Sequence, residues 1–408
     1  MSGLTRDGYL LFGARAARLF AYGFLSVVLV LYLDQAGLTT PQVGLLLTLT
    51  LIGDTLISLW LTTHADRAGR RLMLLAGAGL MIFAGILFAV TRNYLLLIAA
   101  ATIGVISPSG NEVGPFLAIE QASLAQLTPD RSRTQVFAWY NLTGSFATAL
   151  GALCGGGLAQ ALLDTGVEPL HSYRAVVIGY ALMGAVLAGV FTRLSPAVEV
   201  AVRPGPETLG SRLGLSESRG VVFRLSALFA LDAFAGGFVV QSIVAFWFHT
   251  RFGVQPATLG AIFFAANILA GISALLAARV AARIGLINTM VFTHVPSNIL
   301  LLLVPFAPVL PLAIALLLLR FSISQMDVPT RQSYTMAVVS PGERSAAAGI
   351  TGIARTTGAA LAPVIAGRLL ASSALLGLPF VIAGSLKLVY DALLWRSFRS
   401  VKPPEEQG

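Results

Sequence analysis

Long apolar runs separated by short polar segments fill almost all of this 408-residue chain. A helix that crosses a bilayer needs about 20 mostly apolar residues. The runs are continuously apolar rather than alternating, which favours helices over the strands of a membrane barrel. We therefore predict an all-α membrane protein with twelve transmembrane helices, at residues 9–33, 42–61, 72–91, 94–118, 134–159, 174–191, 222–248, 257–281, 287–308, 310–336, 346–370 and 376–396.

Two of these runs carry helix-breaking residues together with polar ones. The fourth contains SPSGNEVGPFLAIEQ, with Pro and Gly on both sides of Glu112, and the tenth contains SQMDVPTRQSY. Proline and glycine free backbone groups that must find partners or water, so both runs are predicted to be interrupted helices. Such interruptions at matched positions of two halves are typical of a translocation route.

The chain repeats itself. Residues 18–24 (RLFAYGF) correspond to residues 232–238 (DAFAGGF), and later positions match in the same order at an almost constant offset. The matched pairs are Gly37/Gly253, Gly44/Gly260, Arg67/Arg283, Gly69/Gly285, Pro115/Pro329 and Gly144/Gly358. We interpret this as a duplication that gives two pseudo-symmetric six-helix bundles, 1–192 and 222–408, joined by a linker at 193–221.

Composition and charge agree with a bilayer location. Hydrophobic residues make up 56% of the chain and charged residues 11%, too few to cover a soluble globule of this size. Most basic residues fall at one set of helix ends, which the positive-inside rule assigns to the cytoplasm together with both termini. We therefore expect an integral plasma (inner) membrane protein. Its net charge of +9 sets its orientation in the membrane, and we expect no binding of nucleic acid.

Several classes of protein are disfavoured. The four scattered histidines show no metal-ligand spacing, no paired catalytic constellation is visible, and there is no GxxxxGK[ST] phosphate loop. The sequence thus predicts neither a metal site, nor an enzyme, nor an ATP-driven pump, and no cofactor beyond an ion gradient.

The loop at 63–71, THADRAGRR, resembles the cytoplasmic signature of the major facilitator superfamily, with Asp66, Gly69 and Arg70 in place. GSFATALGALCGG at 144–156 is similar to the glycine-rich antiporter motif of that family, and the eleventh run keeps Pro363 and Gly367. In these motifs the chain is most similar to the twelve-helix drug/proton antiporters. The resemblance covers the whole chain.

The resemblance implies two bundles around a central cavity that open alternately to either side. In the family the loop aspartate holds the outward-open state, so Asp66 would contact the start of the eleventh helix, whose N-terminus favours a carboxylate. The alternative is a basic turn that only sets topology. The expected gating residues are Asp66, Arg67, Gly69, Arg70, Arg71, Arg133, Glu343 and Arg344.

Ionisable residues inside the runs are the candidates for function, because a charge in hydrocarbon is costly unless it faces a cavity or a partner. In the first run Arg15, Arg18, Tyr22 and Ser26 share one helical face, which predicts that they line the cavity, although Arg15 could instead reach the cytoplasmic surface. Asp232 stands at the repeat position of Arg18. We expect an Arg18–Asp232 pair that forms or breaks as the halves rock, so that reversing both charges restores transport.

Two carboxyl groups are the expected proton sites. Asp54 lies deep in the second run and Glu112 in the interrupted fourth run. Burial favours the protonated form of a carboxyl group and a nearby arginine the ionised form, so a change of neighbours can load and release a proton. The alternative for either is a static salt bridge to Arg15, Arg18 or Arg320. Glu120 is expected near the cytoplasmic end, paired with Arg131 or Arg133.

Further polar residues are expected to line the substrate cavity. They are Asn111, Gln241, Arg320, Gln325 and Asp327. Arginines favour an anionic or zwitterionic solute and carboxylates a cation, and both are present. We predict a monomeric secondary transporter that works by alternating access and exports small organic molecules in exchange for protons. The alternatives are a symporter or facilitator that imports a small organic anion or nutrient and, from another class, a lipid flippase or a membrane receptor.

Overall fold

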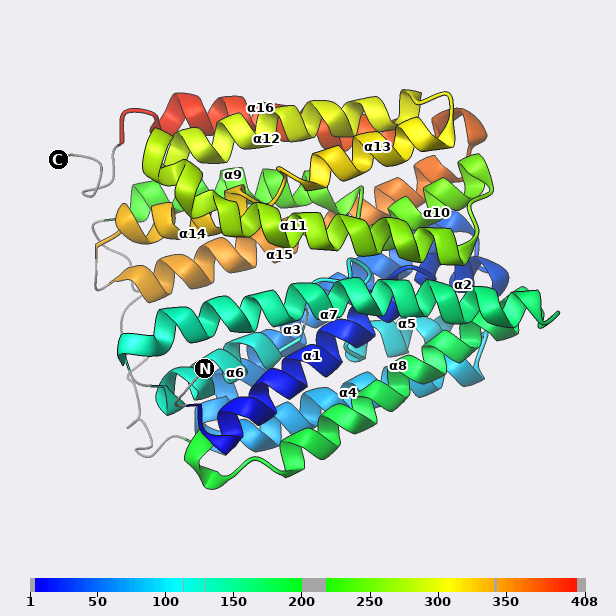
Figure 1. Ribbon diagram of the computed structural model, residues 1–408, viewed down its shortest axis with the longest axis horizontal. Coiled ribbons are helices and arrows are strands. Elements are labelled where there is room, and N and C mark those ends of the chain that lie inside the picture. Colours follow the sequence, from blue (N-terminus) through cyan, green and yellow to red (C-terminus); the bar gives the residue numbers. More distant parts are fainter. Residues whose placement is uncertain (1–3, 113, 129, 200–217, 341–342, 402–408) are drawn as a thin grey trace. The chain divides into compact units, whose positions relative to one another are not determined.

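The computed structural model describes residues 4–112, 114–128, 130–199, 218–340 and 343–401. Within these ranges the side chains of Asp66, Arg67, residues 130–135, Ser345 and Ala346 are not described. All regular elements in the described ranges are helices, as the apolar runs predicted (Figure 1). The chain forms two compact units, one of residues 1–206 and 240–264 and the other of residues 207–239 and 265–408.

The helices of the first unit follow the predicted runs. They are α1 (Arg6–Ser26), α2 (Leu29–Gln35), α3 (Thr40–Ala68), α4 (Arg70–Val90), α5 (Tyr94–Ile103), α6 (Phe116–Leu127), α7 (Asp130–Asp164), α8 (Pro169–Thr192), α10 (Gln241–Phe252) and the start of α11 (Pro256–Ile284). A 45° bend separates α1 from α2. Just before it, the Ser26 hydroxyl donates to the carbonyl of Gly23 at 3.0 Å, a local bond that competes with the helical ladder.

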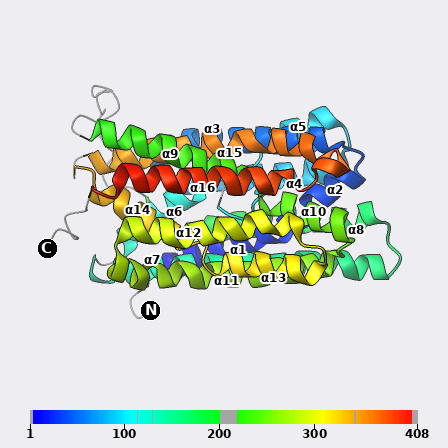
Figure 2. The same ribbon diagram turned by 90° about the horizontal axis from the view of Figure 1, so that it is seen from above.

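The second unit contains the remaining helices. They are α9 (Arg219–Gly237), the rest of α11, α12 (Leu286–Leu303), α13 (Leu310–Phe321), α14 (Asp327–Ala337), α15 (Arg344–Leu370) and α16 (Leu378–Phe398). The expected division at VPFAPVLP is confirmed, since α12 ends at Leu303 and α13 begins at Leu310. Figures 1 and 2 show α12 lying along α16, with which it packs.

The two interrupted helices are confirmed, and one is more interrupted than predicted. In the fourth run α5 ends at Ile103 and α6 begins at Phe116, and the described residues between them form no helix. Pro108 disfavours helix for the residue before it, and Gly110 and Gly114 take positive φ angles of 70° and 83°, which other residues rarely adopt. The break in the tenth run is shorter, between Phe321 and Asp327.

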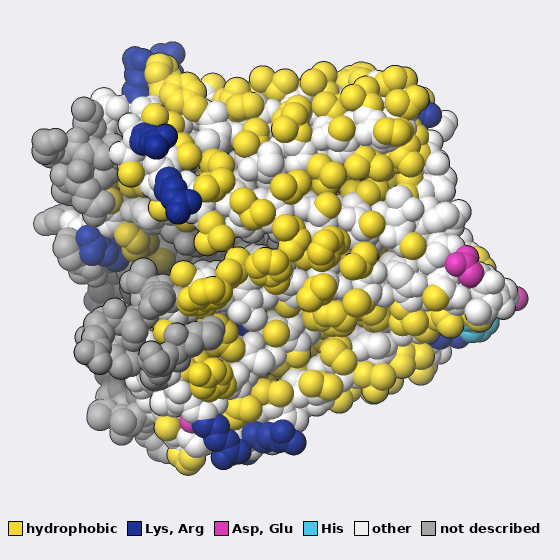
Figure 3. Space-filling model, in the orientation of Figure 1, with side chains coloured by type: hydrophobic (Ala, Val, Ile, Leu, Met, Phe, Trp, Pro, Cys, Tyr) yellow, Lys and Arg dark blue, Asp and Glu magenta, His cyan; other side chains and the backbone are white. Residues whose placement is uncertain are grey.

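Length and apolar composition qualify eight helices among the described residues as membrane spans, and the bent α1–α2 pair makes a ninth. The other three predicted spans correspond to α5 with α6, α13 with α14, and α15. Hydrophobic side chains cover the drawn face (Figure 3). Outward residues such as Leu95 and Val90, each 73% exposed, are where lipid would lie.

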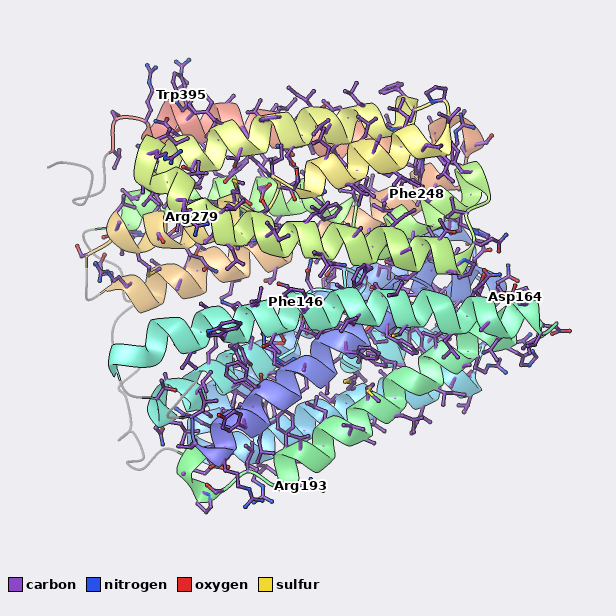
Figure 4. All side chains as sticks on the ribbon, viewed as in Figure 1. Phe146, Asp164, Arg193, Phe248, Arg279 and Trp395 are labelled. Atoms are coloured by element: carbon purple, nitrogen blue, oxygen red, sulfur yellow. The ribbon has the colours of Figure 1, made fainter. Side chains whose placement is uncertain are left out.

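Charged residues mark the ends of each unit. In the first unit Asp164, at the end of α7, and Arg193, after α8, lie at opposite ends (Figure 4). In the second unit Arg279 on α11 lies at the same end as Trp395 on α16, next to Arg396 and Arg399 (Figure 4).

The boundary between the units differs from the sequence repeat. The repeat places 240–264 in the second half, but these residues pack in the first unit, where α10 lies against α2. The backbone N–H of Ser242 donates to the carbonyl of Pro108 at 3.1 Å, and a side chain at Gly156 of α7 would clash with Gly260 of α11. The expected linker falls largely on residues 200–217, outside the described part of the chain.

Each unit has a very close helix pair built on glycine at related positions of the repeat. α1 packs on α7 so tightly that a Cβ added at Gly23 would lie 2.1 Å from the carbonyl oxygen of Thr148. At the repeat-related position, a Cβ on Gly237 of α9 would lie 2.4 Å from the carbonyl oxygen of Ala359 of α15. Gly151 and Gly155 of the 144–156 motif serve the same contact, because an added Cβ would meet the carbonyl oxygen of Phe20 at 2.0 Å and that of Phe24 at 2.1 Å.

We expect Gly23→Ala to destabilise the protein by about 1–3 kcal/mol, because the obstructing atom belongs to the backbone and cannot swing away. Gly13→Ala is the matched control on the same helix, since no atom lies within 4 Å of the added Cβ. Alanine there is expected to stabilise slightly through its helix propensity. Thermal unfolding of both variants in detergent checks the pair, and equal midpoints would contradict the close packing of α1 on α7.

Candidate functional site

Two buried charge networks, one in each unit, contain most of the residues that the sequence singled out. In the first unit the centre is Arg18 of α1, which is 0% exposed. Its Nε donates to Glu112 Oε1 at 2.8 Å, and its two terminal nitrogens donate to the carboxylate of Glu120 at 2.5 and 2.9 Å. The fork of donors on arginine fits this arrangement of two carboxylates.

Arg15, one turn earlier on α1, completes this network. Its NH1 donates to Glu112 Oε2 at 2.6 Å and its Nε to the carbonyl of Tyr140 at 3.0 Å. The hydroxyl of Tyr140 donates to Glu120. Two arginines therefore face two carboxylates, and the network is neutral. Arg15 is 7% exposed, so the alternative that it reaches the surface is wrong.

The network bears on one prediction and decides one alternative. Glu120 was expected near the cytoplasmic end, but it lies one turn into α6, is 0% exposed and pairs with Arg18. The side chains of Arg131 and Arg133 lie outside the described part, so the expected pairing with them stays a prediction. The position of Glu120 one turn into α6 could have been anticipated only if the break before α6 had been placed correctly. Glu112 forms the salt bridges that the static alternative required.

Asp54 lies in a different environment. Its Oδ1 accepts the backbone N–H of Gly114 at 2.6 Å and the hydroxyl of Ser58 at 3.3 Å. Among the described residues no Lys, Arg or His forms an ion pair with it. The static salt bridge is therefore not found for Asp54, and its backbone donor belongs to the interrupted segment between α5 and α6.

The remaining predicted residues of the first unit are dispersed. Tyr22 is 0% exposed and stacks on Tyr180 with ring centroids 6.5 Å apart, a packing position rather than a cavity wall. Gln241 donates to the Ser26 hydroxyl at 2.8 Å. The side chain of Asn111 is exposed, and its carbonyl accepts the Ser107 hydroxyl at 2.7 Å.

In the second unit the centre of the network is Asp232 of α9, which is 5% exposed. Its Oδ1 accepts Lys387 Nζ at 2.5 Å, and its Oδ2 lies 3.3 Å from Arg331 NH1. The same Arg331 nitrogen donates to Asp327 Oδ2 at 2.8 Å. Arg18 and Asp232, at related positions of the repeat, therefore each hold opposite charges within their own unit. The expected Arg18–Asp232 pair would join the two units, and it stays a prediction.

Sequence reasoning missed several members of this second network. Lys387 and Asp391 lie one turn apart inside the last apolar run, where their charge alone was a signal. Asp391 is 0% exposed; its Oδ1 lies 2.8 Å from His294 Nδ1, and its Oδ2 accepts Asn298 Nδ2 at 2.8 Å.

Two arginines of the second unit, Arg320 and Arg355, form no ion pair with a described residue. Arg320 Nε is buried and makes no hydrogen bond with a described residue, and its guanidinium lies 5.0 Å from the ring centre of Phe321. Arg355 of α15 forms no hydrogen bond or ion pair with any described residue, although it is within electrostatic reach of Asp232 and Asp327. Gln325, also predicted for the cavity, donates only its backbone N–H to Ser273 at 3.3 Å among the contacts described.

Residues of the predicted gating loop form hydrogen bonds that hold helix ends of the first unit together. Glu199, which sequence reasoning missed, caps the start of α4 by accepting the backbone N–H groups of Arg70 and Arg71 at 2.7 and 3.1 Å. Gly69 precedes them with a φ of 108°. The Arg71 side chain donates to the carbonyl of Thr192 at 2.5 Å. The side chains of Asp66, Arg67 and Arg133 lie outside the described part, so their gating contacts stay a prediction.

The counterpart in the second unit is also a cap. Glu343 is 7% exposed and accepts the backbone N–H of Ser218, just before α9, at 2.9 Å. The Arg344 Nε donates to the carbonyl of Met336 at 2.9 Å and so ties α15 to the end of α14. Both loops thus fix helix ends within their own unit.

Comparison with known proteins agrees with the fold and with the loop motif. The family model of the Major Facilitator Superfamily matches residues 11–363. The chain is 30% identical over 97% of its length to the uncharacterized membrane protein YJR124C of Saccharomyces cerevisiae, of which it covers 95%. It is 27% identical to the quinolone resistance protein NorA of Staphylococcus aureus over 138 residues, 34% of each chain.

Among solved structures, the nucleoside transporter NupG superposes with a TM-score of 0.78 at 13% identity, over 96% of this chain and all of NupG. At that identity the similarity concerns the fold alone. The family model and the full-length relative carry the assignment, and they agree with the duplicated, interrupted helices described above. The chain belongs to the Major Facilitator Superfamily and is an integral membrane transporter, a secondary carrier of small molecules rather than an enzyme.

Proposed function

We propose that this carrier exports small organic molecules in exchange for protons, and that Asp54 carries the proton. The observation that supports this best is the isolation of Asp54, whose described partners are one backbone N–H and one hydroxyl. A carboxyl group with no fixed cation can exist in either protonation state, whereas one held by two arginines, such as Glu112, stays ionised. Glu112 would then act in coupling only when Arg15 and Arg18 move away from it.

The position of Asp54 suggests how a proton could be linked to movement. Its main donor, Gly114, ends the segment from 104 to 115, which also supplies the Pro108 carbonyl that accepts the N–H of Ser242. A change in the charge of Asp54 would change the strength of the Gly114 bond, since hydrogen bonds to ionised groups are the stronger ones. The same segment would carry that change to α10.

The contacts of 240–264 suggest which end of the transporter is shut. The basic residues predict that the end of the first unit with Gln241 and Ser26 is the outer one. The Gln241–Ser26 and Ser242–Pro108 hydrogen bonds would then close the outer end, and both would have to break when the substrate is released outside. Both termini would be cytoplasmic and the protein a monomer of the inner membrane, driven by the proton gradient without a cofactor.

The direction of transport is supported by similarity. NorA is a quinolone resistance protein, and the glycine motif at 144–156 resembles that of antiporters. A second candidate function, import of a small organic anion, is favoured by a separate observation: Arg320 and Arg355 make no ion pair with a described residue. An anionic substrate would supply the missing negative charge.

Proteoliposomes that hold a pH gradient and an internal pH dye test the proposal. The substrate panel consists of lipophilic cations, organic anions and sugars, and we expect one of these classes to release protons from the gradient. We expect Asp54→Asn to abolish this proton release while its substrate exchange without a gradient continues. Asp164→Asn is the control, because that carboxylate is exposed at the end of α7. Proton movement that survives in Asp54→Asn would contradict the role of Asp54, and organic anions moving with the protons would favour the second candidate.

A further inference from the structure

The interior of the second unit contains a histidine between two carboxylates. His294 of α12 is 4% exposed. Its Nδ1 lies 2.8 Å from Asp391 Oδ1 on α16, and its Nε2 lies 3.9 Å from Asp232 Oδ1 on α9. An ionised carboxylate only accepts hydrogen bonds, so with Asp391 ionised Nδ1 carries a hydrogen towards it. The other ring nitrogen, Nε2, faces Asp232, and it carries a proton only when the imidazole is positively charged.

Asp391 has no permanent positive charge beside it. Its two oxygens are held by His294 and by Asn298, which lies one turn further along α12. Among the described residues no Lys or Arg contacts it. A buried carboxylate without a counter-ion is costly, and a proton shared with His294 is the charge available to neutralise it.

Counting charges over the contacts gives the same result. Among the described residues Lys387 and Arg331 form the ion pairs with Asp232 and Asp327, whereas Asp391 pairs with no Lys or Arg. Of the three carboxylates, Asp391 is therefore the one whose charge is not balanced by a contacting Lys or Arg, and a protonated His294 balances it. A neutral His294 leaves the Asp391 carboxylate without a contacting cation.

The charged and aromatic groups near His294 come from several helices of the second unit. Tyr390 of α16 lies edge-on to its ring at 5.9 Å, next to Asp391 and Lys387. α9 presents Asp232, and α14 presents Arg331 and Asp327. Arg320 of α13 and Arg355 of α15 are within electrostatic reach of Asp232 and Asp327. These two arginines lower the cost of the negative charge at Asp232 but leave Asp391 dependent on His294.

We propose that His294 and Asp391 form a second proton-binding site, whose proton passes to Asp232 and so controls the Asp232–Lys387 ion pair. The proton leaves His294 Nε2, whose electron pair stays on nitrogen, and binds Asp232 Oδ1. The 3.9 Å gap is longer than a hydrogen bond, so transfer requires α9 and α12 to approach each other. Neutral Asp232 then releases Lys387. This inference rests on the proposed proton coupling and places a second step of it in the other half of the repeat.

The direct test follows the protonation of His294 in the full-length protein. With ¹³C,¹⁵N-labelled histidine, the His294 signals are assigned by their loss in His294→Gln. We expect an imidazolium signal at neutral pH that is lost in Asp391→Asn. A neutral imidazole throughout the range of about pH 5 to 8, in which a histidine normally changes charge, would overturn the site whatever the transport assay shows.

Transport then tests whether the site takes part in coupling. Glutamine keeps a donor for Asp391 but binds no proton, so His294→Gln should retain substrate exchange while its proton-driven transport loses its pH dependence. His171→Gln is the control, because His171 is exposed and contacts only the nearby Glu168. An unchanged pH profile in His294→Gln would overturn the inference. A protonated His294 in a wild type that moves no protons with substrate would instead refute the proposed function while the proton site stands.

Discussion

Replacing Arg18 by glutamine is expected to prevent the protein from accumulating in a folded form. The substitution leaves Glu120, which is fully buried, without a cation, and takes one of two cations from Glu112. Breaking a buried ion pair from one side costs about 3–5 kcal/mol, because the remaining charge stays desolvated. The yield of monodisperse protein after extraction and its unfolding temperature measure the effect.

Two further variants show whether the charge itself is responsible. Arg18→Gln combined with Glu120→Gln removes both members of the buried pair while Glu112 keeps Arg15, so we expect stability to recover in large part. Arg193→Gln, an exposed arginine after α8, is the control for loss of positive charge and is expected to change little. If Arg18→Gln were as stable as Arg193→Gln, the buried network would not hold the first unit together.

Reversing the charges at Arg18 and Asp232 together is expected not to restore transport, contrary to what the repeat suggested. An arginine at position 232 would face Lys387 and Arg331, and an aspartate at position 18 would face Glu112 and Glu120. Like charges in contact inside the membrane add to the cost of burial. Each single reversal and the double reversal should therefore all fail to fold or to transport.

The comparison for this prediction is the removal of a contacting ion pair within the second unit. Asp232→Asn combined with Lys387→Gln removes a contacting pair and leaves Arg331 bound to Asp327, so it should fold better than Asp232→Asn alone. Folded yield and substrate exchange of these two variants measure this. Recovery of transport by the double charge reversal would mean that Arg18 and Asp232 interact directly.

The interrupted helices illustrate what local sequence can determine. Pro108, Gly110 and Gly114 restrict or release backbone angles wherever they occur, so a break in the fourth run followed from them alone. Its extent did not, because proline also occurs inside helices of this chain, as Pro296 does in α12 and Pro363 in α15. The close approach of Gly104 to Ala84, where an added Cβ would lie 2.3 Å from the Cβ of Ala84, depends on how the helices of the unit pack.

The glycine motif shows the same division. Its sequence indicated a close approach of helices, and the repeat indicated that Gly23 and Gly237 are equivalent. That α7 is the neighbour of α1, and that α15 is the neighbour of α9, depends on contacts between segments more than 100 residues apart.

The amino-acid sequence by itself determined the membrane class, the apolar spans, the duplication and the two breaks, because each depends on composition or on spacing along one helix. It also identified most of the buried charges, since a charge inside an apolar run is conspicuous. Only the tertiary structure decided how they pair. Glu112 lies 97 positions from Arg15, and Asp391 lies 97 from His294. Such partners are chosen by which helices pack together, and that choice left Asp54 without a described counter-ion and made His294 the one to balance Asp391.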